Sequence, residues 1–285
     1  MESTKKHVSV KEGIISAIDE NHNGEIDIED IIIKGLKTPG IRINRFDFLR
    51  KEFALKYPAD ILDRLSLESP VAVGISNEDI EKVATETIKF ERNCVSGISA
   101  LLGTPGGWAM VATIPADIIQ YYAYMLRAAQ KLMYLYGFPE IIGGEAGNID
   151  TTTINLLVVC LGVMYGVAGA KNALLTISKA LGKGVEKQLL SKALTKGAVY
   201  PIVKKVAKWF GVKMTKEVFA GFFNKAIPVV GGIAGGVITY VSFKPCCEKL
   251  KEALKENTSA KHDCLIEGDD LVLLETAEST TNTEE

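Results

Sequence analysis

The chain has 285 residues, of which 47% are hydrophobic, and its 33 basic and 35 acidic residues give a formal net charge of −2. This composition excludes an intrinsically disordered chain, and the length suffices for one large or two small domains with a sizeable core. The near-zero charge also argues against a nucleic-acid binder that works through bulk positive charge.

Helices are expected along most of the chain, because periodic apolar segments are common and strand-like alternation is scarce. Residues 1–58 form a polar N-terminal region, residues 59–255 a helical body, and residues 256–285 an acidic tail that we expect to be disordered. We therefore predict an all-α fold, a multi-helix bundle with Gly-rich buried helices. Long helices are expected over Glu78–Leu102, Ala116–Tyr136, Thr151–Leu181, Val185–Phe210 and Val229–Leu254.

Capping residues mark several helix starts. Ser76 with Asp79 has the spacing of a capping box, and Asn44 precedes Asp47 by the same three residues. Pro115 suits the first turn of a helix, because its missing N–H would have no partner there. These residues place helix starts near positions 45, 77 and 116.

Three uncharged segments are long enough to cross a bilayer: Asn93–Ala116 has 24 residues, Thr151–Ala170 has 20 and Ala226–Phe243 has 18. The first is interrupted by a Gly-Thr-Pro-Gly-Gly sequence, the second opens with three threonines, and the third contains four glycines. Small residues recur at the spacing that allows close helix packing in either a membrane or a soluble bundle. Burial in a soluble bundle and partial insertion into a membrane both stay open.

The segment Asp19–Asp30 matches the twelve-residue calcium loop of an EF-hand. Gly24 falls at position 6, where the backbone turns sharply, and Ile26 is the apolar residue at position 8. Val10–Ile18 and Ile28–Leu36 are expected to be the entering and exiting helices. The candidate metal ligands, at positions 1, 3, 5, 7, 9 and 12, are Asp19, Asn21, Asn23, Glu25, Asp27 and Asp30.

Two departures from the EF-hand pattern predict weak binding. Position 12 holds Asp30 in place of the longer glutamate, and positions 3 and 5 hold neutral asparagines. We therefore expect a calcium dissociation constant on the order of 10⁻⁴ M or higher, or tolerance of magnesium. Ile43–Asp47 resembles the end of a second, ligand-free loop. The alternative is an Asx-rich helix–turn–helix that binds no metal.

Several separated segments resemble EcsC-like proteins of Gram-positive bacteria. They are Ile31–Arg45, Gly106–Asp117, Leu135–Phe138 and Lys225–Gly232, and the resemblance covers roughly residues 12–255. The EcsC family is named after a gene encoded beside an ABC transporter, and no catalytic residue of the family is established. The resemblance therefore implies a membrane complex, such as an ABC transporter, as partner and assigns no activity.

The residue inventory disfavours an enzyme. The three histidines, His7, His22 and His262, lie near the termini, and no P-loop or GxSxG motif is present. We therefore name no catalytic residue. The five cysteines have no CxxC spacing and the first residues have no apolar segment, so we expect a reducing cytoplasm and no secretory signal.

An alternative function is a pocket for a lipid or small ligand, or a hydrolase site, on the helix that follows Pro115. Asp117 is the residue most suited to act there as an acid, although capping the helix or forming a buried ion pair also accounts for it. The polar residues that would line this pocket are Asp117, Gln120, Tyr121, Tyr124 and Arg127.

The near-zero net charge results from an uneven distribution of charge along the chain. Residues 171–225 contain twelve lysines and two acids, a net of +10, whereas residues 256–285 contain nine acids and one lysine, a net of −8. The tail is therefore a candidate to screen the basic segment. Within that segment, an amphipathic helix is expected to carry Lys204, Lys205 and Lys208 on one face and to end in Trp209 and Phe210.

Such a helix suits the surface of an anionic membrane, although the solvated face of a bundle helix is an equally good account. Binding to a phosphate backbone is disfavoured, because the basic face lacks arginine and interleaved aromatic residues. We therefore expect a non-enzymatic, cytoplasmic accessory protein. It would associate peripherally with the inner face of the cell membrane or with a membrane complex, have a weak calcium loop, and not bind nucleic acid.

Overall fold

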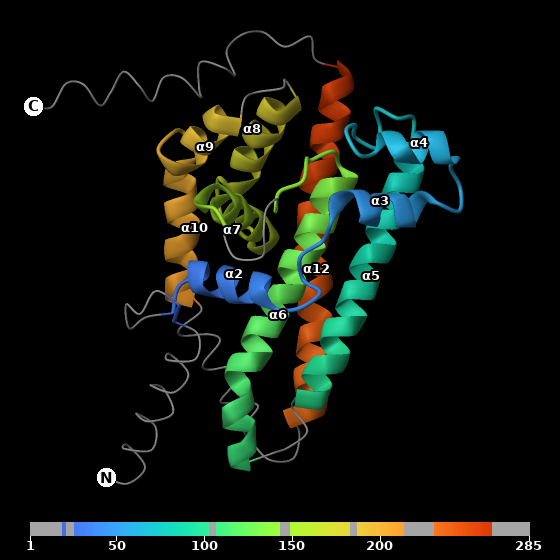
Figure 1. The fold of residues 1–285 in the computed structure, drawn as a ribbon. Coiled ribbons are helices and arrows are strands. Elements are labelled where there is room, and N and C mark those ends of the chain that lie inside the picture. Colours follow the sequence, from blue (N-terminus) through green and yellow to red (C-terminus); the bar gives the residue numbers. More distant parts are fainter. Residues whose placement is uncertain are drawn as a thin grey trace, which may run out of the picture. The chain divides into compact units, whose positions relative to one another are not determined.

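Helices alone make up the part of the chain that the structure describes. The structure is a computed structural model, and it describes residues 19–20, 26–102, 107–142, 149–182, 187–213 and 231–263. Within these ranges there are ten helices and no strand (Figure 1). The all-α multi-helix fold that the periodicity predicts is therefore confirmed.

The helices differ widely in length, and α5, α6 and α12 are the longest, with 26, 29 and 33 residues. In chain order the helices are α2 (Ile28–Lys37), α3 (Arg45–Phe53), α4 (Ala59–Arg64), α5 (Asn77–Leu102), α6 (Gly107–Leu135), α7 (Thr151–Tyr165), α8 (Ala170–Gly182), α9 (Lys187–Thr195), α10 (Tyr200–Lys213) and α12 (Gly231–Asp263).

The chain divides into two compact units, and neither is a continuous stretch of sequence. Unit 1 consists of Met1–Arg42, Ile88–Ala128 and Ala207–Pro245. Unit 2 consists of Ile43–Thr87, Ala129–Val206 and Cys246–Glu285. The boundaries fall inside α5, α6, α10 and α12, so each of these helices contributes to both units.

Two of the expected long helices are each split in two. The segment Thr151–Leu181 forms α7 and α8, because Gly166 and Gly169 have φ angles of 73° and 94°, which a continuing right-handed helix does not allow. The segment Val185–Phe210 likewise forms α9 and α10. The apolar periodicity of the sequence does not reveal the break between α7 and α8, because Val167, which lies in this break, is also buried.

The expected start of α6 is wrong. The helix begins at Gly107, so Pro115 lies in its interior and Asp117 is not near its N-terminal end. A proline removes one backbone hydrogen bond, and the apolar residues upstream of it continue the helix in a segment long enough to tolerate that loss. At the C-terminal side, α12 continues to Asp263, so residues 256–263 of the expected disordered tail are helical.

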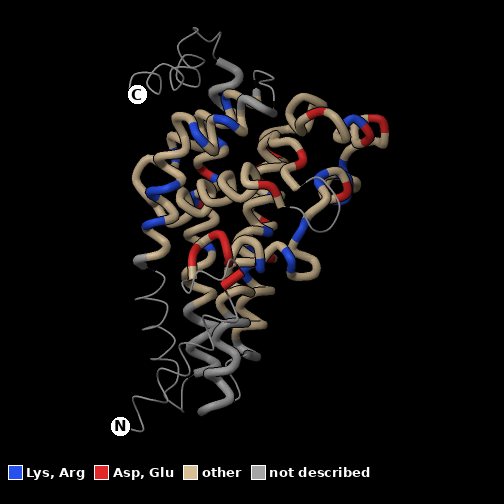
Figure 2. Tube along the Cα trace, turned by 60° about the vertical axis from the view of Figure 1, so that its left-hand side comes forward, with Lys and Arg blue, Asp and Glu red and all other residues tan. Residues whose placement is uncertain are grey.

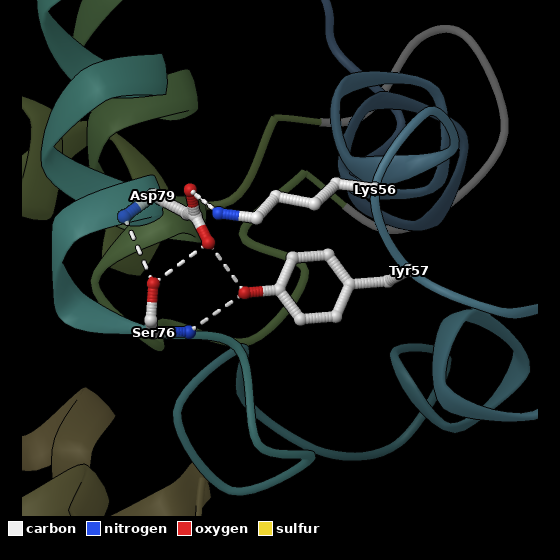
Figure 3. A network of polar contacts seen from close by, with 4 residues as sticks. All are labelled: Lys56, Tyr57, Ser76 and Asp79. Carbon is white, nitrogen blue, oxygen red and sulfur yellow. Dashed lines mark hydrogen bonds and ion pairs between the residues drawn. The ribbon is translucent and has the colours of Figure 1, made fainter.

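The two expected cap residues, Asn44 and Ser76, hold helix starts in unit 2. Asn44 Oδ1 accepts from the backbone N–H of Asp47 at 2.8 Å, and Ser76 Oγ accepts from that of Asp79 at 3.2 Å. The Asp79 carboxylate also accepts from Ser76 Oγ at 2.7 Å, from Lys56 Nζ at 2.6 Å and from Tyr57 Oη at 2.5 Å (Figure 3). The start of α5 is thereby tied to the turn that follows α3.

Acid is expected to weaken this connection. The hydrogen bond from Lys56, followed by those from Tyr57 and Ser76, holds the pKa of Asp79 below its ordinary value of 3.8. A lowered carboxylate pKa contributes stability that is present above pH 3.8 and is lost as the pH falls below it. Asp79→Asn should therefore lower the thermal midpoint at pH 7, and the difference from wild type should shrink below pH 3.8. Melting curves between pH 7 and pH 2.5 would measure this, with the exposed neighbour Glu78→Gln as control; a constant difference would contradict it.

A buried arginine joins several loops of unit 2. Arg45, which is 6% exposed, donates from Nε to the carbonyl of Phe138 at 2.9 Å, from Nη2 to that of Glu68 at 2.7 Å, and from Nη1 to that of Leu65. Its backbone N–H donates to Glu140 Oε2 at 2.7 Å. The Arg45 side chain therefore satisfies three backbone carbonyls that belong to no common helix.

A glycine allows helices of unit 2 to pack closely. Gly162 lies on α7, and a Cβ atom there would be 2.6 Å from Val206 Cγ2 on α10 and 3.0 Å from the Cβ of Ala170 on α8. Val206 and Ala170 are both fully buried. The small residues that the sequence places along α7 therefore serve this packing.

Among the described helices, none combines the length and apolar character needed to cross a bilayer. The described cysteines, Cys94, Cys160, Cys246 and Cys247, form no disulfide.

Candidate functional site

The calcium-loop segment is partly described. Asp19, Asp27 and Asp30 are placed, whereas Asn21, Asn23 and Glu25 lie outside the described residues, as does the expected entering helix. The expected exiting helix is present as α2, which begins at Ile28 as predicted and ends at Lys37. Within the described residues, no three His, Cys, Asp or Glu side chains are grouped as metal ligands would be.

The Asp30 carboxylate forms hydrogen bonds to the backbone at both ends of the loop segment. Asp30 is 1% exposed, and it accepts from the backbone N–H of Glu20 at 2.8 Å and from that of Asp27 at 3.0 Å. Asp27 in turn accepts from the N–H groups of Glu29 and Asp30, which completes a capping box at the start of α2.

Both basic and acidic side chains surround the Asp19–Asp30 segment. Glu20 forms ion pairs with Lys34 Nζ at 3.0 Å and with Lys37 Nζ at 2.9 Å, and hydrogen bonds from Lys37 and Lys34 lower the pKa of Glu20. Burial, followed by repulsion from Asp27 and Asp30, raises the pKa of Glu29. The carboxylates of Asp27, Glu29 and Asp30 would attract a cation, whereas Lys34 and Lys37 would repel one.

The residues expected to line a pocket lie on one face of α6 in unit 1. Tyr121 Oη is 3.1 Å from Ser242 Oγ on α12, and Arg127 Nε is 3.4 Å from Glu91 Oε1 on α5. Burial raises the pKa of Tyr124, whose ring lies 5.8 Å from the Arg127 guanidinium carbon. The Gln120 amide nitrogen is buried without a hydrogen-bond partner, and the Asp117 side chain lies outside the described residues.

Sequence reasoning missed Glu91, which is fully buried beside Arg127. A signal was available, because Glu91 shares its helix face with Ile88 and Val95, and both are fully buried. An acid in phase with core residues predicts a buried partner, which here is Arg127. The other missed residues are Ser242 and the Ser99–Thr239 pair, whose hydroxyl oxygens are 3.4 Å apart.

The helix α10 carries the expected lysines and no acidic residue; Figure 2 marks basic residues along the backbone in blue and acidic ones in red. Lys204, Lys205 and Lys208 are exposed, whereas Val206 and Phe210 on the opposite face are 0% and 1% exposed. The Phe210 ring lies 6.1 Å from that of Tyr122 in unit 1, so it packs inside the protein and is not available to a membrane. Most of the apolar face of α10 is therefore covered by the protein itself, whereas Trp209 is partly exposed and the three lysines are exposed.

Comparisons of the chain with protein-family models, with curated proteins and with solved structures find no match.

Proposed function

We propose that the chain is a non-enzymatic accessory protein that associates peripherally with an anionic membrane surface or with a membrane complex. One observation carries this proposal: the consecutive helices α8, α9 and α10 contain eight lysines and no acidic residue. Exposed lysines near an anionic leaflet contribute about 1 kcal/mol each at moderate ionic strength.

The exposure of the lysines supports the proposal. Lys192, Lys196, Lys204, Lys205 and Lys208 all have exposed side chains. A set of exposed lysines attracts anionic lipid headgroups, and the attraction is screened by salt. The resemblance of the sequence to EcsC-like proteins is our reason for proposing a transporter complex at the cytoplasmic face as the alternative binding partner.

Reversing the charge of the basic face is expected to weaken vesicle binding. Lys204→Glu/Lys205→Glu should lower the partition coefficient onto phosphatidylglycerol-containing vesicles by about tenfold or more, and raising the salt concentration should weaken wild-type binding. The control is Lys51→Glu/Lys82→Glu, which makes the same charge change at two exposed lysines of unit 2. Vesicle flotation measures both variants, and equal losses, or no wild-type binding at all, would reject the proposed function.

The proposal includes a weak calcium loop at Asp19–Asp30. Calorimetric titration should give a calcium dissociation constant on the order of 10⁻⁴ M or higher for the wild type and no heat above background for Asp19→Ala. The exposed Asp47→Ala serves as the control outside the loop. Identical titration curves for Asp19→Ala and wild type would show that the loop does not bind calcium. Running vesicle flotation with calcium and with a chelator would show whether the loop influences membrane binding.

A further inference from the structure

The charge-free parts of three helices come together in unit 1. Residues 93–116 and 226–243 contain no charged residue, so α5 beyond Arg92, α6 before Asp117 and α12 before Lys244 are uncharged. Contacts of Glu91 with Arg127, of Ser99 with Thr239 and of Tyr121 with Ser242 show that α5, α6 and α12 run side by side here (Figure 1).

Three polar side chains in or next to the charge-free parts face the interior of unit 1. Glu91, Ser99 and Thr239 are 0%, 2% and 5% exposed, and each contacts a polar group on a neighbouring helix. Large apolar residues lie on the outside where the charge-free parts begin: Phe90, just before that of α5, and Tyr240 and Val241 of α12 are 55%, 45% and 64% exposed. Polar groups paired inside and apolar groups outside are the arrangement expected of a bundle in contact with lipid.

Basic and aromatic residues mark where the charge-free part begins. The Arg92 guanidinium carbon lies 3.9 Å from the centre of the Tyr240 ring, and Arg92 also donates to Asn93 Oδ1 at 3.1 Å and 3.3 Å. Lys89 and Lys244 are exposed on α5 and α12 at the same boundary. Tyrosine with arginine and lysine is the combination found at the headgroup level of membrane proteins, where the cations also meet anionic lipids.

The lengths of the charge-free parts fit one leaflet. Residues 93–102 of α5 and 107–116 of α6 each extend about 15 Å, and residues 231–243 of α12 extend about 20 Å. The hydrocarbon core of a bilayer is about 30 Å thick, so each part reaches about half of it.

We infer that these three helix ends insert together into one leaflet of a membrane containing anionic lipid, with Arg92, Lys89 and Tyr240 at the headgroup level. The inference rests on the proposed membrane association and gives it a second attachment, distinct from the lysines of α10. A second copy of the chain covering the same apolar residues is the competing outcome, and the experiment below separates the two.

The two tryptophans of the chain provide natural reporters. Trp108 belongs to the charge-free part of α6, and Trp209 to the basic helix α10. In the full-length chain, Trp209→Phe leaves Trp108 as the reporter, and Trp108→Phe leaves Trp209. With phosphatidylcholine–phosphatidylglycerol vesicles brominated along the acyl chains, Trp108 emission should fall to less than about half of its value with unbrominated lipid, and Trp209 emission should change little.

The outcomes separate the inference from the proposed function. Vesicle binding without quenching of Trp108 would overturn insertion and leave surface association through α10 intact. No binding to anionic vesicles would reject the proposed function itself. A dimer in solution whose Trp108 emission does not respond to vesicles would overturn the inference in favour of a second copy.

A matched pair of double variants gives an independent readout. Phe90→Glu/Val241→Glu should lower vesicle partitioning by about tenfold or more, because two exposed apolar side chains at the boundary become acidic. Leu55→Glu/Leu67→Glu makes the same change at leucines of unit 2 that are 103% and 93% exposed, and it should leave partitioning within about twofold of wild type. All four residues are exposed, so the thermal midpoints should stay close to that of the wild type. Equal losses in the two double variants would overturn the inference.

Discussion

Arg45→Met is expected to lower the free energy of unfolding by about 3 kcal/mol or more. The side chain is 6% exposed, and its guanidinium donates to the carbonyls of Leu65, Glu68 and Phe138. Methionine keeps much of the apolar volume but removes all three donors. The three carbonyls would then lack the partners that buried backbone oxygens require.

Denaturant unfolding measures this effect, and the same helix supplies a control. Arg50 lies on α3 with Arg45, is half-exposed, and forms an ion pair of 3.5 Å with Asp63. Arg50→Met should change the free energy of unfolding by less than about 0.5 kcal/mol, because an exposed ion pair contributes little. A loss below about 1 kcal/mol for Arg45→Met would show that the carbonyls find other partners.

Gly162→Ala is expected to destabilise the protein by about 1–3 kcal/mol, although alanine is the better helix former. The added Cβ would lie 2.6 Å from Val206 Cγ2 and 3.0 Å from the Cβ of Ala170. Val206 is fully buried and β-branched, so it has few alternative rotamers within a helix. The helices must therefore move apart to admit the methyl group.

Two comparisons make this prediction specific. Gly97→Ala, on α5, adds a Cβ that meets nothing within 4 Å, so it should be neutral or stabilise by up to about 1 kcal/mol. In the double variant Gly162→Ala/Val206→Ala, the removed methyl groups make room for the new one. Its loss of unfolding free energy should therefore be smaller than the sum for the single variants. Strict additivity would contradict a contact between the two residues.

Local sequence signals located much of the candidate sites. The start of α2 at Ile28 follows from the match of Asp19–Asp30 to an EF-hand loop, and the start of α5 follows from Ser76 and Asp79. These predictions succeed because a loop motif and a helix cap each depend on residues a few positions apart. The face shared by Lys204 and Lys208 could also be predicted, since helical period alone puts them together.

The predictions failed where the outcome depends on residues distant in the sequence. Pro115 suggests a helix start, yet α6 begins at Gly107, because local propensity is weaker than the continuation of a long helix. The burial of Phe210 depends on Tyr122, and that of Glu91 on Arg127, and neither partner is near in sequence. The amphipathic pattern of α10 predicts an apolar face without saying whether lipid or protein covers it.

The sequence by itself determined the all-α class, the cap residues, the lysine-rich and acid-free stretch and the charge-free segments, because each depends on composition or on spacings of a few residues. Only the tertiary structure decided that most of the apolar face of α10 is buried in the protein. It alone also placed Arg92 against Tyr240 where the charge-free parts of α5 and α12 begin. These outcomes depend on which helices pack together, and that is set by contacts between residues more than a hundred positions apart in the sequence.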